Sequence, residues 1–306
     1  MTGNEADHEA LAEVQKWLPI ICARVEKTRV VCRGLGHIYG EIKKSSDIVL
    51  SEALLDALPI KVSVLDLETG RQDADFRIFY QPIPQPKLPA IEWEKRKLRE
   101  PSADNNDNDE ALRIFHNLER VSVGFWKAFR DRGEHQPWVD SRYNMKFSRP
   151  TVGYVPRHPY AWTANCGLQV DNIQLPHFSF RLVNYTKPQE TLARGELLAI
   201  TAYMEWRAKQ PEYVERYYLP VLCISVFAGK ARLLLAYHDG KNLCISKSKL
   251  YDFSKNQIEN YELLARWMYS KPCGDTDEPL KIEAPKLDKQ SKKHLKRLLR
   301  SVFGVK

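Results

Sequence analysis

Residues 195–268 constrain the fold most, because two tight turn signals divide an apolar region into short strand-like segments. Gly229 is followed by Lys230, and Asp239 is followed by Gly240. Both pairs favour the two-residue turns that join antiparallel strands. The strand-like segments are residues 219–227, 231–237 and 243–251. Because helix-type segments lie on either side, the sequence predicts an α-β-β-β-α antiparallel meander core in a protein of the α+β class.

The two flanking helices have different patterns. Residues 195–207 contain no helix breaker and are apolar on nearly all sides, which is typical of a buried helix. Ser254 and Gln257 fit a capping box that opens the second helix. Its apolar positions lie on one face at helical spacing: Ile258, Tyr261, Ala265 and Met268.

Composition divides the remaining chain into segments. Residues 1–80 are predicted to form an N-terminal α/β element, with a helix over 8–27 that Pro19 ends or kinks. The other local predictions there are β structure over 29–42, a short helix over 49–57, and a hairpin of 60–67 with 76–80. A Pro-rich and acidic linker is predicted over 81–109, with disorder in its tract 104–109, then a main α+β domain over 110–285 and a basic amphipathic helix over 286–306. The main domain is predicted to include a helix over 110–130, an irregular stretch over 135–162 and a strand over 175–185.

The composition indicates a cytoplasmic protein, with a nuclear location as an alternative. The chain has 306 residues, 43% of them hydrophobic, but no apolar run of about 18 residues that would span a membrane. The first residues are acidic and polar, unlike a signal peptide. The six cysteines are scattered without ligand spacing, which predicts reduced thiols rather than a zinc site. His177, in an apolar segment, is predicted to be a core residue.

The C-terminal segment 286–306 holds almost all of the excess positive charge. It contains eight Lys/Arg and one acid, whereas the whole chain has a net charge of +8. Such a basic amphipathic helix can bind RNA, a membrane surface or a partner protein, or can simply be docked by its leucines. Nucleic acid, tRNA in particular, is the preferred interpretation, and the candidate contacts are Lys292, Lys293, Lys296, Arg297 and Arg300.

A second candidate surface is the stretch 138–162, which alternates cationic and aromatic residues. Cations bind phosphates, and aromatic rings stack with unpaired bases. The alternative is a Pro-rich loop whose rings pack onto the core. The candidate contacts are Arg142, Tyr143, Lys146, Arg149, Arg157 and Trp162.

Within the meander, Glu196 and Asp239 could hold Mg²⁺ beside Lys247 or Lys249, an arrangement that suits phosphoryl chemistry. Asp239 also has a structural reason to be present, since Asp-Gly forms a tight turn. The order of elements over 196–268 resembles the core of the PD-(D/E)XK nuclease-like superfamily, with Ser246-Lys247-Ser248-Lys249 where that family carries an acidic-x-Lys triplet. The resemblance implies either a Mg²⁺-dependent nuclease or a non-catalytic nucleic-acid- or protein-binding module on a degenerate core.

Three further segments resemble a group of uncharacterised filamentous-fungal proteins. They are 192–199 (LARGELLA), 219–227 (LPVLCISVF) and 248–253 (SKLYDF), within a similarity over about 175–276. In overall size and basic balance the chain is similar to fungal arginine-containing cyclodipeptide synthases. This resemblance implies a transferase of secondary metabolism that makes a diketopiperazine, a small-molecule product, from aminoacyl-tRNAs without a cofactor.

In such an enzyme, carboxylates would bind a guanidinium or amine of the substrate and assist proton transfer. The catalytic candidates in this chain are Glu196, Glu205, Lys247 and Lys249.

Overall fold

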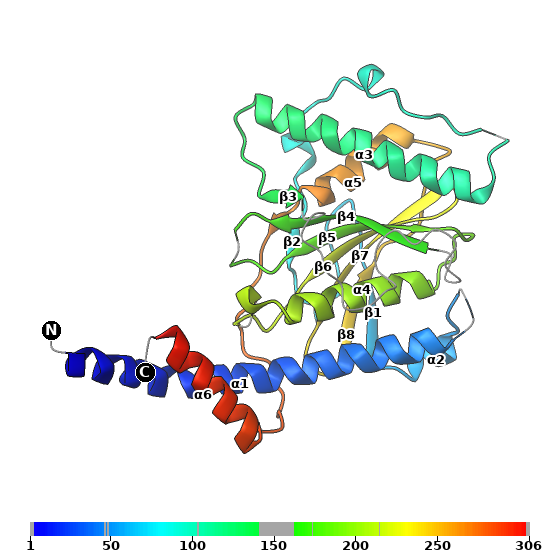
Figure 1. Cartoon of the computed structure of the whole chain (residues 1–306). Helices are drawn as coiled ribbons and strands as arrows, with labels where there is room; N and C mark the ends of the chain where they lie inside the picture. The colour runs from blue at the N-terminus through cyan, green and yellow to red at the C-terminus, as the bar shows by residue number, and fades with distance from the viewer. Residues whose placement is uncertain are drawn as a thin grey trace.

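The computed structural model describes residues 3–303 except 46, 48, 103, 141–161, 173 and 214. Within these residues, an eight-stranded sheet forms the centre of the protein (Figure 1). Its order is β1-β8-β7-β6-β5-β4-β3, and β9 also pairs with β7. The strands of this sheet are β1 (Ile60–Val64), β3 (Trp138–Asp140), β4 (Trp162–Val170), β5 (Phe178–Asn184), β6 (Val221–Val226), β7 (Lys230–His238), β8 (Leu243–Lys247) and β9 (Tyr251–Asp252).

The other elements surround this sheet. A small two-stranded sheet pairs β2 (Tyr80–Gln81) with β10 (Lys271–Pro272). The α-helices are α1 (Gly3–Lys44), α2 (Glu52–Asp56), α3 (Asp107–Asp131), α4 (Arg194–Ala208), α5 (Gln257–Met268) and α6 (Lys289–Val302). Short 3₁₀ turns occur at η1 (Gln85–Lys87), η2 (Glu94–Arg96) and η3 (Pro211–Tyr213).

The predicted α+β class is confirmed, but the three predicted strands do not form a separate meander core. β6, β7 and β8 pair antiparallel in chain order. They lie in the middle of a mixed sheet, because β5 runs parallel to β6 on one side and β1 runs parallel to β8 on the other. Strands covered on both faces are apolar almost throughout, which explains the continuous apolar runs in this part of the sequence.

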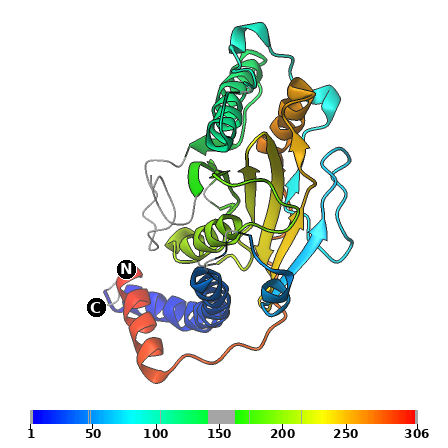
Figure 2. The ribbon, with the colours of Figure 1, turned by 90° about the vertical axis from the view of Figure 1, so that its right-hand side faces the viewer.

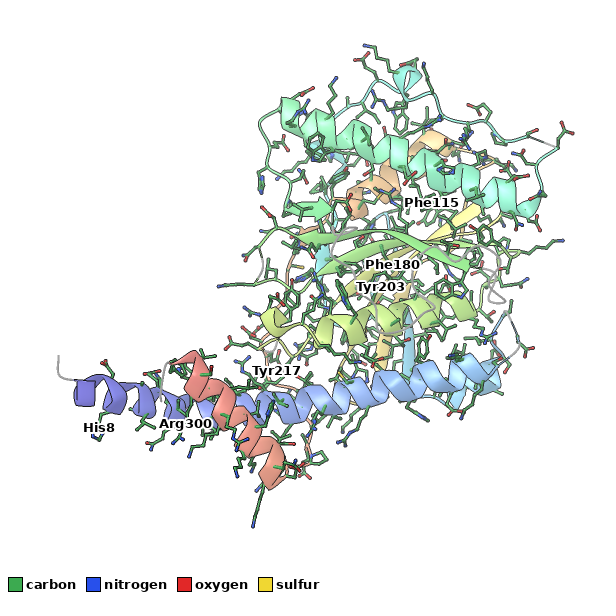
Figure 3. All side chains as sticks on the ribbon, in the orientation of Figure 1. His8, Phe115, Phe180, Tyr203, Tyr217 and Arg300 are labelled. Atoms are coloured by element: carbon green, nitrogen blue, oxygen red, sulfur yellow. The ribbon has the colours of Figure 1, made fainter. Side chains whose placement is uncertain are left out.

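Helices cover both faces of the sheet. α3 and α5 lie over one face, whereas α4 lies against the other and α1 lies outside α4 (Figures 1 and 2). Every residue of α4 is buried, as its all-round apolar pattern predicts, because α4 is enclosed between the sheet and α1. The ring of Phe180 on β5 stacks with Tyr203 on α4, with ring centroids 4.2 Å apart (Figure 3).

The β structure predicted over residues 29–42 is wrong, since α1 continues without interruption to Lys44 and includes Pro19. Buried side chains recur on this segment at spacings of three and four, the period of a helix. They are Val31, Leu35, Ile38, Tyr39 and Ile42. Branched residues in this segment suggested a strand, but contact of this face with α4 decides the conformation.

The predicted hairpin of residues 60–67 with 76–80 is also wrong. A local turn does form, because the Asp66 amide donates to the Arg71 carbonyl at 2.9 Å. The strands themselves pair elsewhere: β1 lies parallel to β8, and β2 lies antiparallel to β10. The partners are therefore distant in sequence, and no local pattern indicates them.

Two helix starts differ from prediction. The acidic tract predicted to be disordered instead opens α3, where the Asn106 side chain accepts hydrogen bonds from the amides of Asn108 and Asp109. The capping box predicted for α5 does not form, since its N-cap is Asn256 in a left-handed conformation with φ of 49° and no side-chain cap. The predicted apolar face of α5 is buried except at Ile258, which is 42% exposed.

Two glycines of α1 provide a matched test of its packing. A Cβ on Gly34 would lie 2.7 Å from Nε2 of the buried His238, whereas a Cβ on Gly40 would have nothing within 4 Å. We expect Gly34→Ala to lower the free energy of unfolding by about 1–3 kcal/mol through overpacking. Gly40→Ala should raise it by about 0.5–1 kcal/mol through helix propensity. Urea unfolding of both variants measures this, and equal effects would contradict the placement of α1.

Candidate nucleic-acid interface

The structure does not gather the four predicted catalytic residues into one site. Glu196 is buried in the first turn of α4, and Lys247 ends β8 close to it. Glu205 lies near the other end of α4, where it pairs with Lys209 at 2.7 Å. Lys249 is exposed and lies over the ring of Tyr251, 5.0 Å from its centroid.

Glu196 belongs to a buried ion pair with Arg232 of β7. Neither side chain has any exposed surface. The guanidinium donates from Nε to Oε1 at 2.8 Å and from Nη2 to Oε2 at 2.5 Å, a bidentate geometry. Oε2 also accepts the amide of Ala193 at 2.8 Å. Both carboxylate oxygens are therefore occupied, and a substrate could not contact them without opening this cluster.

The remaining donors of Arg232 hold the chain that enters α4. They bond to the carbonyls of Gln189, Glu190 and Thr191 at 2.8–3.1 Å. Lys247 donates to the same Glu190 carbonyl at 2.5 Å. Burial and the nearby Arg232 lower the pKa of Lys247, which Glu190 and Glu196 partly offset. The cluster thus acts as a clamp on residues 189–191.

The predicted pairing of Glu196 with Asp239 around Mg²⁺ does not assemble. Arg232, which binds Glu196, lies near the start of β7, whereas Asp239 follows its end. At about 3.3 Å of rise per residue, these two positions are separated by about 23 Å. Asp239 instead accepts the amides of Lys241 and Asn242 in the turn. Among the described residues, no group of three or more His, Cys, Asp or Glu is placed to hold a metal ion.

Removing one partner of the buried Glu196–Arg232 pair should strongly lower the free energy of unfolding. Arg232→Met leaves the Glu196 carboxylate buried without its Arg232 counter-charge and leaves the carbonyls of Gln189 and Thr191 without this donor, so we expect a loss of about 3–5 kcal/mol in unfolding free energy. Lys209→Met is the control, because Lys209 is half exposed and its ion pair should contribute less than about 1 kcal/mol. Urea denaturation compares them, and a loss below 1 kcal/mol for Arg232→Met would contradict the clamp.

The predicted core position of His177 agrees with its complete burial. Its Nε2 lies 3.0 Å from the Cys273 carbonyl and donates to it, and burial lowers the pKa of the imidazole to about 4. His238 behaves alike: its Nδ1 accepts the Gly240 amide, and burial lowers its pKa to about 4. Both rings are therefore neutral in the folded protein at neutral pH.

These two histidines predict acid sensitivity. In the unfolded chain they bind protons below a pKa of about 6.5, but in the folded protein only near 4, so stability falls as pH decreases from about 6.5 to 4. Each residue contributes a slope of at most about 1.4 kcal/mol per pH unit. Urea unfolding measured between about pH 6.5 and pH 4 tests the expected fall in stability. His177→Gln should make the slope shallower, and a flat profile in the wild type would contradict the burial of neutral rings.

The described residues include only part of the aromatic and basic stretch. Arg142, Tyr143, Lys146, Arg149 and Arg157 lie outside the described residues. Trp162 opens β4 and is 4% exposed, and its ring packs so closely on Gly195 that a Cβ there would lie 2.7 Å from Trp162 Cγ. This ring has no exposed face for a base, contrary to the prediction.

The predicted basic helix forms α6 and lies across the N-terminal part of α1 (Figures 1 and 2). We call α6 and residues 3–33 of α1 the arm. The N-terminal end of α1 extends beyond the sheet in Figure 1. Leu299 of α6 is buried, as is Leu287 just before it. The Leu287 amide donates to Glu26 of α1 at 2.6 Å, and Lys27 of α1 donates to the Leu280 carbonyl at 2.9 Å.

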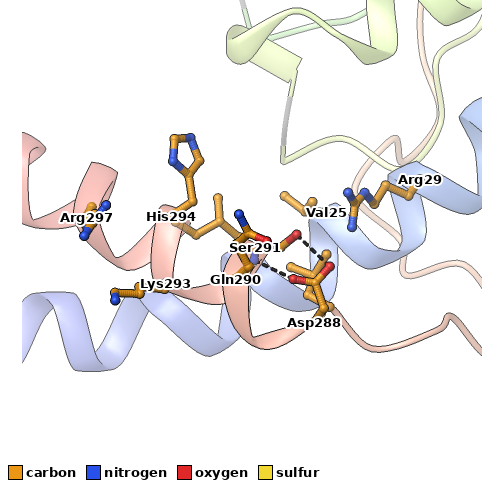
Figure 4. Close-up of a pocket in the computed structure, with 10 residues that line it drawn as sticks. Val25, Arg29, Asp288, Gln290, Ser291, Lys293, His294 and Arg297 are labelled. Atoms are coloured by element: carbon orange, nitrogen blue, oxygen red, sulfur yellow. Dashed lines mark hydrogen bonds between the residues drawn. The ribbon is translucent and has the colours of Figure 1, made fainter.

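A groove of about 590 Å³ runs between the two helices of the arm (Figure 4). Its cationic lining residues are Arg29 from α1 and Lys293 and Arg297 from α6, with His294 beside them. Among the described residues, Asp288 is the one acid that lines it, and its carboxylate caps α6 by accepting hydrogen bonds from the amide and hydroxyl of Ser291 at 2.7 and 3.1 Å. The groove therefore has a positive character.

The predicted cations of α6 are all exposed, and among the described residues none is paired with an acid. They are Lys292, Lys293, Lys296, Arg297 and Arg300, preceded by Lys289. Lys293, Arg297 and Arg300 follow at spacings of four and three, so they lie along one face over about 10 Å of helix. By contrast, Arg24 of α1 is used internally, over the Tyr217 ring at 5.3 Å.

Sequence reasoning missed two residues that shape these sites. Arg232 lies in an apolar strand, and a single arginine there was the only available signal, because such a residue must find an acid when buried. Arg29 begins the segment 29–42 that is predicted to be β structure, and the helical periodicity of the buried residues that follow it indicates α1 instead.

Comparison of this chain with protein-family models, with curated proteins and with solved structures finds no match. The resemblances to fungal proteins, cyclodipeptide synthases and nucleases therefore stay predictions. In addition, none of the described helices is both long and apolar enough to cross a membrane.

Proposed function

We propose that this protein is a nucleic-acid-binding module whose arm holds the phosphate backbone. In this proposal the Glu196 cluster is structural and catalyses no reaction. The observation that supports it is the exposed positive charge of α6, which pairs with no acid in the described part of the chain, beside the groove that contains Arg29. Phosphate backbones bind such surfaces with release of counterions, and side chains such as Lys293 and Arg297 suit phosphate oxygens. Glu196 and Glu205 lie near opposite ends of α4, and each is paired with a basic residue, which supports binding without turnover.

The shape of the arm favours nucleic acid over a membrane surface. A helix lying on a bilayer buries its apolar face in lipid, but Leu299 of α6 is used to dock onto α1. Two apolar residues of α6 are exposed, Leu298 at 50% and Val302 at 75%, and neither is aromatic. The groove is concave and has Arg29, Lys293 and Arg297 in its lining, which suits a phosphate backbone better than a flat headgroup layer.

The prediction of a tRNA-dependent cyclodipeptide synthase overlaps this proposal only in its partner. Binding of tRNA by the arm would serve either function. Formation of an arginine-containing diketopiperazine stays a prediction, because Glu196 is tied to Arg232 and Glu205 is paired with Lys209.

Binding can be measured by fluorescence anisotropy with uncharged tRNA and a 20-nucleotide single strand over a range of salt concentrations. We expect affinity to fall steeply with salt, with a log–log slope of about −0.7 to −0.9 for each phosphate contact. The triple variant Lys292→Gln, Lys293→Gln, Arg297→Gln should bind about 10- to 100-fold more weakly at low salt and have a slope shallower by about 2–3.

A matched variant removes the same charge elsewhere: Lys87→Gln, Lys255→Gln, Lys271→Gln, all exposed lysines outside the arm. It should bind nucleic acid as the wild type does. Equal losses in both triple variants would contradict the proposal, as would tight binding of the wild type to anionic vesicles with none to either nucleic acid.

A further inference from the structure

A second cavity lies at the end of the sheet where β7 stops and β1 and β8 begin, and its lining shares no residue with the groove of the arm. It has a volume of about 470 Å³, within the range of small-molecule sites. Segments far apart in sequence line it: Lys61, the residues around Phe76, Tyr218, the β7–β8 turn and Lys281. We call it the sheet-end pocket.

Aromatic and polar side chains on its floor are held rigidly. Tyr237 is 5% exposed, and its hydroxyl oxygen accepts the Arg77 amide at 3.0 Å. The Arg77 guanidinium lies over the Tyr218 ring, 4.5 Å from its centroid, and is fixed by a bidentate pair with Glu278 at 2.5 and 2.8 Å. Phe76 meets the Tyr237 ring edge to face at 6.4 Å.

The Tyr218 hydroxyl is a polar group of the floor that is available to a ligand. Tyr218 is 3% exposed, yet its hydroxyl forms no hydrogen bond with any group in the described part of the chain. Burial raises the pKa of Tyr218, so the hydroxyl keeps its proton and can donate it. Burial and Asp239 also raise the pKa of Cys244 to about 12, so this thiol is no nucleophile at neutral pH. The floor is therefore suited to binding.

The mouth of the pocket is cationic. Lys61, Lys241 and Lys281 are exposed and form no ion pair with the described acids. Two carboxylates also line the pocket, Asp75 and Asp239, and the second is held in the turn by the amides of Lys241 and Asn242. Lysines at the mouth favour a phosphate group. The Tyr218 and Tyr237 rings are buried, whereas the Phe76 ring is only partly buried and favours a planar ring against it.

We propose that the sheet-end pocket binds a nucleoside diphosphate, with the phosphates at Lys61, Lys241 and Lys281, the base against the Phe76 ring, and the Tyr218 hydroxyl donating to the nucleoside. This ligand site goes beyond the proposed function of the arm. It uses side chains from other segments and requires none of the cations of α6.

Isothermal titration calorimetry with ADP tests the site on the full chain. ADP should bind with one-to-one stoichiometry, and adenosine and inorganic pyrophosphate should each bind at least about tenfold more weakly, because each supplies half of the contacts. Tyr218→Phe, which keeps the ring, should weaken ADP binding about 5- to 10-fold. Lys61→Gln with Lys281→Gln should weaken it at least about tenfold.

Two controls separate this site from others. Lys87→Gln with Lys255→Gln should leave ADP affinity within about twofold of wild type, as should the triple variant of α6. Thermal unfolding followed by circular dichroism verifies that Tyr218→Phe is folded. Absence of ADP binding at millimolar concentration overturns the inference, as does wild-type affinity in the Lys61 and Lys281 variant. Loss of binding in the α6 variant also overturns it, because ADP would then occupy the arm.

Discussion

The buried ion pair of Glu196 and Arg232 is the interaction on which the rest of the structure depends. Two charges without solvent are costly unless their remaining hydrogen-bonding positions are filled. Here one amide and three carbonyls fill them, so the pair joins the start of α4, the strand β7 and the chain of residues 189–191 at one point. The position of α4 against the sheet follows from that junction.

The placement of α1 follows from α4. Because α4 is buried on all sides, another element must cover its outer surface, and α1 does so with the face that includes Leu35 and Ile38. α1 is longer than is needed to cover α4. Its N-terminal part extends past the sheet in Figure 1 and provides the surface on which α6 lies.

Charged side chains consequently occur in two different environments. In the core, Arg232 is neutralised by Glu196, and Arg113 pairs with Glu110 at 2.8 Å. On α6 the cations remain exposed beside a groove that has one acid, and that acid caps the helix. Buried charges need partners for stability, whereas exposed unpaired charges of one sign create a field that attracts phosphates. This contrast separates the framework of the protein from its proposed binding surface.

Local signals in the sequence were sufficient for features that local interactions control. The turn signals at Gly229 and Asp239 placed β6, β7 and β8 approximately, although the turns centre on Ala228-Gly229 and Gly240-Lys241, each one residue from the predicted pair. The periodic leucines and lysines of α6 indicated its helix and its charge. Local signals misled at residues 29–42, where branched side chains outweighed helical spacing. They also misled at Trp162, where a ring beside cations suggested base stacking, although the ring packs on Gly195.

By itself, then, the sequence determined the α+β class, the central strands and a basic amphipathic end, because turn geometry, periodicity and net charge are properties of neighbouring residues. Only the tertiary structure decided that β1 pairs with β8, that Glu196 is neutralised by Arg232, and that Arg29 joins α6 at a groove. These outcomes depend on contacts between residues far apart in the chain. Whether a charge is neutralised inside or left free to bind a partner depends on such contacts.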